Sequence, residues 1–259
     1  MTTPKIENKK TLSTIYIALI ATWTALLLAT SIIPAYPIFG TAATITFSSI
    51  LLSSLTAPLL GPLYGMASGF IFGMVVPYIN PATSIGLLTF LAPTLSALMG
   101  GLLLFNRWKE ATLLLVIQLA IWLVNPFAFY ELMPIILWEF VPIFFFLLVP
   151  PVRKWIINSI VNVNKKYLPI ALWCVAWTAR IGGDVATGNN IGVWVMGWGT
   201  PSMYPFWAPM TLYYAVADSL NCLTGALIGT AVLVALQKSG LRFTAIDSLR
   251  LKLSTKLQT

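Results

Sequence analysis

Four charged side chains within or beside long apolar stretches are the residues best suited to specific chemistry. Glu139 lies in LWEFVP, Asp218 lies in AVADSLN, and Arg180 and Asp184 stand one helical turn apart at the end of a third stretch. A charge inside a bilayer is costly unless it is paired, hydrated or protonated, so such residues are candidates for binding sites. They can equally join helices by hydrogen bonds. A structural Arg180–Asp184 ion pair and a ligand contact both stay open.

The connection after Arg180 adds aromatic and amide side chains to these charges. Ile181–Trp207 reads IGGDVATGNNIGVWVMGWGTPSMYPFW, and we predict a long loop on the outer face. Long loops are uncommon unless functional. Its glycines permit close approach of a ligand and its tryptophans offer flat apolar walls, although an interfacial aromatic belt is the alternative. The predicted ligand-binding residues are Arg180, Asp184, Asn189, Asn190, Trp194, Trp198, Trp207, Asp218 and Glu139.

The residue inventory excludes several kinds of site. The chain has no histidine, so imidazole metal ligation, histidine general-base catalysis and histidine-ligated haem are excluded. Cys174 and Cys222 lie in different apolar segments and are interpreted as buried structural thiols. There is no GxxxxGK phosphate loop and no recognisable nucleophile. We therefore expect no enzyme activity, no cofactor and no metal site.

The composition predicts an all-α integral membrane protein. Of 259 residues, 58% are hydrophobic and 8% are charged, and the mean hydropathy is +0.88, whereas soluble domains carry about 25% charged residues. A span needs about 20 helical residues. We predict eight spans, near Thr11–Ile33, Thr44–Ala57, Leu59–Pro77, Ser84–Phe105, Ala111–Val124, Leu132–Val149, Tyr167–Arg180 and Ala208–Leu236. The second, fifth and seventh are short, so six spans are the alternative.

Charge placement predicts the orientation. With a cytoplasmic N-terminus, every basic residue except Arg180 falls on the inner side, which places both termini in the cytoplasm of a cell membrane. The basic residues are too scattered for a nucleic-acid surface. We divide the chain into a single transmembrane helical domain, residues 1–237, and a basic amphipathic cytoplasmic tail, residues 238–259, expected on the anionic inner leaflet.

Two stripes of small residues predict close helix contacts. Ala21, Ala25 and Ala29 repeat every four residues in the first span, and the third span repeats glycine in the same way, including Gly65 and Gly69. Small residues let helix backbones approach closely. We predict both stripes as partner-docking surfaces, with packing inside the bundle as the alternative.

Residues 11–105 resemble the substrate-binding S component of energy-coupling factor (ECF) transporters. The resemblance rests on the alanine stripe, the Pro-rich segment IIPAYPIFGTAATITFSSIL and the segment GPLYGMASGFIFG. It implies that the alanines dock on a transmembrane T component and that two cytoplasmic ATPases supply energy. It also implies a ligand near the outer face, capped by Pro34–Thr41 and by the late loop Ile181–Trp207. The family usually has about six spans, and the nickel and cobalt members use an N-terminal histidine that this chain lacks.

The leading hypothesis is therefore a subunit that captures a small vitamin-like or heteroaromatic nutrient from outside. Tryptophans would stack on its ring, Arg180, Asp184 and the two asparagines would fix its polar edges, and Asp218 or Glu139 would offset a cationic group. The alternative is a structural or accessory subunit of a larger membrane complex, docked through its small-residue stripes. A cation-coupled carrier is less favoured because no inverted repeat is evident.

Overall fold

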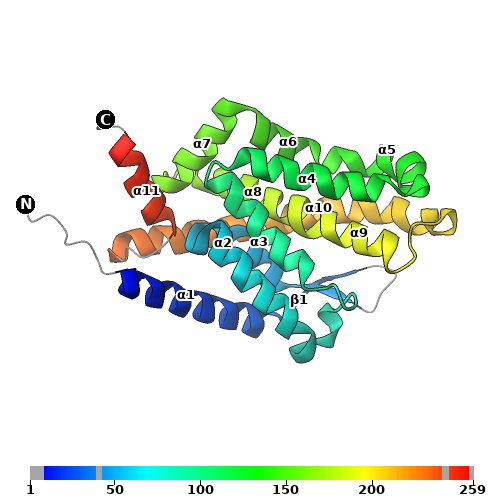
Figure 1. Cartoon of the computed structure of the whole chain (residues 1–259), viewed down its shortest axis with the longest axis horizontal. Helices are drawn as coiled ribbons and strands as arrows, with labels where there is room; N and C mark the ends of the chain where they lie inside the picture. Colours follow the sequence, from blue (N-terminus) through cyan, green and yellow to red (C-terminus); the bar gives the residue numbers. More distant parts are fainter. Residues whose placement is uncertain (1–8, 39–42, 241–244, 257–259) are drawn as a thin grey trace, which may run out of the picture.

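The computed structural model describes residues 9–38, 43–240 and 245–256, and helices dominate it (Figure 1). The helices are α1 (Lys9–Thr30), α2 (Phe47–Ile79), η1 (Pro81–Thr83), α3 (Leu91–Leu104), α4 (Trp108–Leu123), η2 (Ala128–Leu132), α5 (Met133–Ile136), η3 (Leu137–Glu139), α6 (Val141–Leu148), α7 (Pro150–Val161), α8 (Leu168–Ala179), η4 (Arg180–Val185), α9 (Ala186–Trp194), η5 (Pro201–Met203), α10 (Tyr204–Ser239) and α11 (Ala245–Lys256). The strands are β1 (Pro34–Pro37) and β2 (Thr44–Thr46).

The predicted class, a helical membrane protein, is confirmed by the length and composition of these helices. Among the described residues, two helical segments are long and apolar enough to cross a membrane, Phe47–Ile79 and Pro201–Ser239, or up to four if each bent pair of helices is one span. Thr14–Thr30 and Leu91–Leu104 are shorter apolar helices. The count of eight spans stays a prediction.

Helix α2 folds back on itself at Gly61. This glycine has φ 71° and ψ −171° inside an otherwise helical run, a backbone conformation open to a residue without a Cβ atom. A Cβ atom on Gly65 would lie 3.0 Å from Cγ2 of Thr56, whereas a straight helix separates residues nine apart by about 13 Å. Adjacent α1 residues bind both halves, since Trp23 Nε1 donates to Thr56 at 2.9 Å and Thr24 lies 2.8 Å from Ser68. The two halves of α2 are therefore antiparallel neighbours, so Phe47–Ile79 is long and apolar enough for a span but is not one straight helix.

A short antiparallel hairpin, β1–β2, precedes α2 and corrects the predicted second span. Tyr36 pairs with Ile45, and Pro37 pairs with Thr44. The span was expected to begin at Thr44, but Thr44–Thr46 is a strand and the helix begins at Phe47. Alternating β-branched threonine and isoleucine favour the extended conformation. The hairpin buries Tyr36, 9% exposed, against the helices.

The predicted long loop Ile181–Trp207 is wrong. Helix α8 continues through the π-helical stretch η4 into α9, and irregular backbone is confined to Val195–Thr200. The glycines that suggested a loop instead serve packing. A Cβ atom on Gly183 would lie 2.4 Å from Cα of Ser96 in α3, so these two helices touch backbone to backbone. Arg180 consequently lies in the middle of a long helical segment and not at the end of a span.

The predicted sixth span, Leu132–Val149, is broken into η2, α5, η3 and α6. Pro134 and Pro142 stand at the starts of α5 and α6, where a missing backbone N–H is tolerated. The axis of Ala128–Glu139 turns by 116° from that of α4, and α7 turns by 84° from α6. Glu139 closes the short η3 turn in this irregular stretch.

The C-terminal helix α11 packs on the bundle. Its residues Ala245, Ile246 and Leu249 are buried within the protein, so these three side chains cover helices and not the inner leaflet. Residues 241–244 and 257–259 of the predicted tail lie outside the described residues. Arg250 fixes this position, because its Nε donates to the carbonyl oxygen of Val161 at the end of α7 at 3.0 Å. A cation at a helix C-terminus is also stabilised by the partial negative charge of the helix dipole there.

Replacing Arg250 with glutamine is therefore expected to loosen α11 by about 1 kcal/mol, because charged hydrogen bonds to Val161 are lost. Hydrogen exchange should become faster across the described part of α11 and stay unchanged in α10. The matched control is Lys154→Gln, an exposed residue of the same α7 helix. Equal exchange in the wild type and the Arg250 variant would contradict this role.

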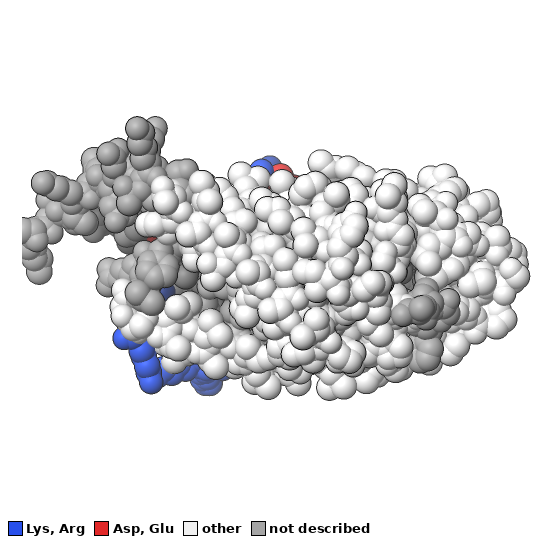
Figure 2. All heavy atoms as spheres, turned by 90° about the horizontal axis from the view of Figure 1, so that it is seen from below, with Lys and Arg blue, Asp and Glu red and all other residues white. Residues whose placement is uncertain are grey.

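Charged side chains are unevenly distributed. Figure 2 shows Lys and Arg gathered toward the end at which α11 and the start of α1 lie, and the opposite half of that face carries neither sign. Arg153 is one basic residue with specific partners, since its Nε donates to Oδ1 of Asn106 at 2.8 Å and its guanidinium lies 5.0 Å from the Trp108 ring centroid. On the face shown in Figure 2, the two ends of the bundle therefore differ in charge.

The two small-residue stripes face different surroundings. Ala21, Ala25 and Ala29 are exposed on α1, so this stripe is open to a partner. Gly65 and Gly69 are buried, and a Cβ atom on Gly69 would lie 2.5 Å from the Pro93 carbonyl oxygen in α3. The docking role predicted for Gly65 and Gly69 is corrected: they serve packing within the chain.

Candidate ligand-binding site

A buried arginine organises the most polar part of the interior. Arg180, only 4% exposed, projects from the π-helical stretch η4. Single π-turns inside α-helices recur at functional sites because they displace one side chain from the regular helical position. Close packing of Gly183 on α3 holds this stretch in place. The local sequence Arg-Ile-Gly-Gly-Asp thus places a cation and an anion, Asp184, on one irregular turn.

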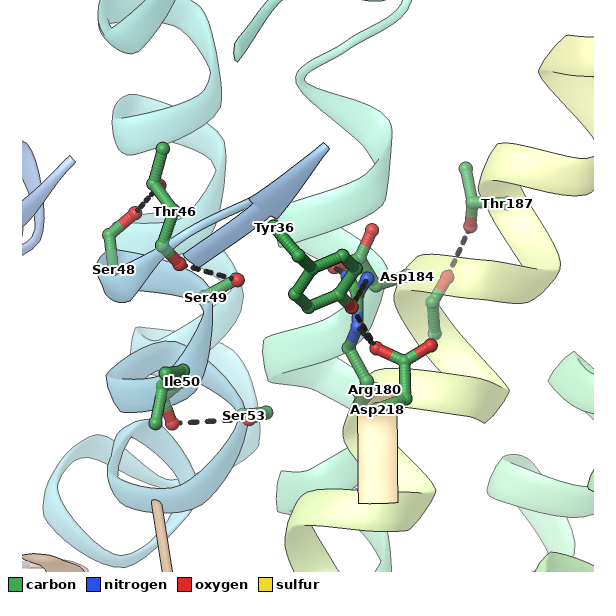
Figure 3. A network of polar contacts seen from close by, with 11 residues as sticks. Tyr36, Thr46, Ser48, Ser49, Ile50, Ser53, Arg180, Asp184, Thr187 and Asp218 are labelled. Carbon is green, nitrogen blue, oxygen red and sulfur yellow. Dashed lines mark hydrogen bonds and ion pairs between the residues drawn. The ribbon is translucent and has the colours of Figure 1, made fainter. Parts of the chain in front are cut away.

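Three side chains from three parts of the chain surround the guanidinium (Figure 3). Its Nε donates to Oδ1 of Asp218 in α10 at 2.6 Å, and its Nη2 donates to the hydroxyl of Tyr36 in β1 at 2.9 Å. Its Nη1 donates to Oδ2 of Asp184, which confirms the predicted ion pair. The Tyr36 hydroxyl in turn donates to Asp218. Every nitrogen of Arg180 therefore has a partner within the protein.

The two aspartates that bind Arg180 differ in their surroundings and in their remaining hydrogen-bonding capacity. Asp218 is 1% exposed, and its Oδ2 atom has no hydrogen-bond partner among the described residues. A buried carboxylate oxygen without a partner is costly, so it points to a group that completes the site. Asp184 is shared between this cluster and the adjoining space under the hairpin.

The cluster forms one wall of an apolar cavity of about 110 Å³. Its aromatic walls are Trp198, Trp207 and Tyr214, and its polar lining includes Glu139 and Asn189. Trp207 is held by its Nε1, which donates to the Trp198 carbonyl oxygen at 3.1 Å, and the two indole rings lie 6.2 Å apart. An apolar pocket with a few convergent polar groups is typical of small-molecule sites. Its lining comes from β2, α5, η3, η4, α9, α10 and the connection between α9 and α10, together with Ile38 and Ile85.

Most of the predicted ligand-binding residues meet at this cavity, and two do not. The lining includes Glu139, Arg180, Asp184, Asn189, Trp198, Trp207 and Asp218. Asn190 instead donates to the carbonyl oxygens of Gln118 and Ala186, and Trp194 donates to that of Ile121. Both therefore face α4. The predicted loop is a helix here, so one side of α9 faces the cavity and the other side faces α4.

Two tyrosines at the site were not predicted as ligand-binding residues. Tyr36 binds both Arg180 and Asp218, and Tyr214 lines the cavity. Tyr36 lies within the Pro34–Thr41 segment that the resemblance implies as a cap. Tyr214 stands four residues before Asp218, a spacing that places both on one helix face. This spacing is the signal that would have identified it.

No group of three or more histidine, cysteine, aspartate or glutamate side chains in the described part of the chain is arranged to hold a metal ion. Cys174 and Cys222 are buried free thiols. No family model matches the chain, and no curated protein and no solved structure matches it.

Proposed function

We propose that this protein is the substrate-binding membrane subunit of an ATP-driven, ECF-type importer of a small heteroaromatic, vitamin-like nutrient. The observation that supports this most is the aromatic cavity lined by Arg180, Asp184 and Asp218, with Tyr36 hydrogen-bonded behind Arg180 and Asp218. Aromatic walls supply affinity for a planar ring, and a few fixed polar groups supply orientation. An ion cluster this deep in an apolar bundle is the kind of feature expected of a transport or binding site.

The position of the cavity agrees with capture from outside. The hairpin, α5 and the α9–α10 connection surround it, at the end opposite α11 (Figure 1). Lys and Arg gather toward the α11 end (Figure 2), and basic loops mark the cytoplasmic side. In this orientation both termini are cytoplasmic, the protein is a multi-pass protein of the cell membrane, and the cavity opens toward the outer face.

The exposed alanine stripe of α1 supports the expected partners. Ala21, Ala25 and Ala29 leave a smooth strip that no described part of the chain covers. In an S component such a strip docks on the T component, which links it to two ATPases. Tandem purification of the full-length protein from its native membrane is expected to recover a membrane subunit together with ATPases.

Ligand capture is tested with a panel of vitamins and the purified full-length protein. We expect one class of compound to raise the thermal unfolding midpoint and to change tryptophan fluorescence. Trp198→Ala is expected to lower the affinity at least fivefold, since the loss of a stacking face costs about 1 kcal/mol or more. Trp194→Ala, outside the cavity and about half exposed, is the matched control and should bind normally. No response to any compound would contradict ligand capture.

The alternative, a structural subunit of another membrane complex, is favoured by one observation. Each nitrogen of Arg180 has a partner inside the protein, and these partners join β1, η4 and α10, which is what a purely structural cluster would do. A stable assembly without ATPases, with function unchanged in Asp218→Asn, would support this alternative against the importer subunit.

A further inference from the structure

The charged side chains of the cavity lining carry a net negative charge. Arg180 is the basic side chain of the lining, and its three nitrogens each donate one hydrogen bond, to Asp218, Asp184 and Tyr36. Two of its five N–H groups are not used in these bonds, but its single positive charge is already matched by the two aspartates. A ligand carboxylate or phosphate would therefore add a further negative charge beside two buried acids, which is unfavourable.

Two acids of the lining have carboxylate oxygens that accept no hydrogen bond from the described residues. Oδ2 of Asp218 is buried and has no partner among the described residues. Glu139, 3% exposed, lines the same cavity from η3, and its carboxylate receives no hydrogen bond from the described part of the chain. The residues that carry these acceptors, Asp218 in α10 and Glu139 in η3, thus line one small cavity. Oδ2 of Asp218 and the carboxylate of Glu139 would each be stabilised by a hydrogen-bond donor on a ligand.

The charges of the lining also favour a cationic ligand. Arg180 balances one of the two aspartates that contact it, and Glu139 adds a third acid. The remaining excess is negative and lies in an apolar space, where its Coulombic attraction for a cation is stronger than in water. The faces of Trp198, Trp207 and Tyr214 also attract cations through their ring quadrupoles.

We propose that the ligand is a small organic cation, a ring that carries a protonated amine or an equivalent charged nitrogen. Its N–H groups donate to Oδ2 of Asp218 and to the carboxylate of Glu139, and its ring lies against Trp198 and Trp207. This inference rests on the proposed function and narrows it, because it rejects nutrients whose polar group is a carboxylate or phosphate.

The test uses probes that share one ring and differ in one group. One series is pyridoxamine, pyridoxine and 4-pyridoxate, and another is 2-phenylethylamine, 2-phenylethanol and phenylacetate. Binding to the full-length protein in detergent is measured by calorimetry and by thermal shift. We expect each amine to bind at least tenfold more tightly than the alcohol of its series and the acid to bind most weakly.

Variants locate the preference at the two acids. Asp218→Asn and Glu139→Gln are each expected to reduce the preference for the amine over the alcohol at least tenfold. Glu139→Gln leaves the contacts of Arg180 intact, so it keeps the test valid should Asp218→Asn fail to fold. Glu131→Gln, exposed on η2 and outside the cavity, is the control and should keep the preference.

Two outcomes overturn different statements. Alcohols or acids that bind as tightly as the amines, with binding that still depends on Trp198, would overturn the cationic class and leave the proposed function standing. Absence of binding by every probe and by the whole vitamin panel would overturn the proposed function as well.

Discussion

Replacing Arg180 with methionine is expected to destabilise the protein by about 3–5 kcal/mol, the cost of breaking a buried ion pair by removing one partner. Asp218, 1% exposed, would lose its cation, and Tyr36 would lose the guanidinium to which it is bound. Thermal unfolding of the purified protein in detergent measures this loss. Arg180→Lys is expected to recover only part of it, because one ammonium cannot reach three separate partners in the guanidinium geometry.

A double variant separates lost charge balance from lost packing. Arg180→Met combined with Asp218→Asn removes both charges and should be more stable than Arg180→Met alone, since no unpaired Asp218 carboxylate remains. The control is Arg107→Met, whose pair with Glu110 at 2.9 Å is about half exposed and should change stability by less than about 0.5 kcal/mol. A double variant no more stable than Arg180→Met would contradict the assigned electrostatic role.

The second large expected effect separates the two small-residue stripes. Gly69→Ala should cost about 1–3 kcal/mol, because its Cβ atom would lie 2.5 Å from the Pro93 carbonyl oxygen and the backbones of α2 and α3 would have to separate. Ala25→Leu, on the exposed face of α1, should leave the unfolding midpoint unchanged. Under the proposed function, Ala25→Leu should nevertheless abolish co-purification with the ATPases.

Two measurements are made on both Gly69→Ala and Ala25→Leu: the thermal unfolding midpoint of the isolated protein and the co-purification of the ATPases. A destabilised Ala25→Leu protein would show that the alanine stripe packs within the chain. A stable Gly69→Ala protein would contradict the close contact of α2 with α3. A stable Ala25→Leu protein that still recovers the ATPases would contradict docking through α1.

The sequence predicted the helical class and most of the site because both follow from local composition. Apolar runs identify buried helices wherever they occur, and charges in such runs are few enough to be taken as candidates one by one. Arg180, Asp184, Asp218 and Glu139 were found in this way, and the structure places all four at one cavity. Their convergence itself depends on tertiary packing, which spacing along the chain does not show.

The wrong prediction of a loop after Arg180 has one physical cause, which is that glycine occurs both in turns and at close helix contacts. Gly182 and Gly183 suggested a loop, although they stand in helix and permit contact with α3. Gly61 does reverse the chain, with a positive φ of 71°. A glycine in the sequence looks the same whether it supplies a turn or removes a side chain from a helix contact. Asn190 and Trp194 were misplaced for this reason, since a loop has no opposite face.

The spacing of the two aspartates around Arg180 has a consequence for biosynthesis. Asp184 follows Arg180 by four residues on the same helical segment, whereas Asp218 follows it by 38 residues, in α10. A chain made from its N-terminus therefore presents Arg180 to the insertion machinery with Asp184 beside it and with Asp218 not yet made. Asp184 alone then stands beside the guanidinium and can balance its charge, and Asp218 joins the cluster only when α10 packs into the bundle. The two acids therefore meet Arg180 at different stages of synthesis.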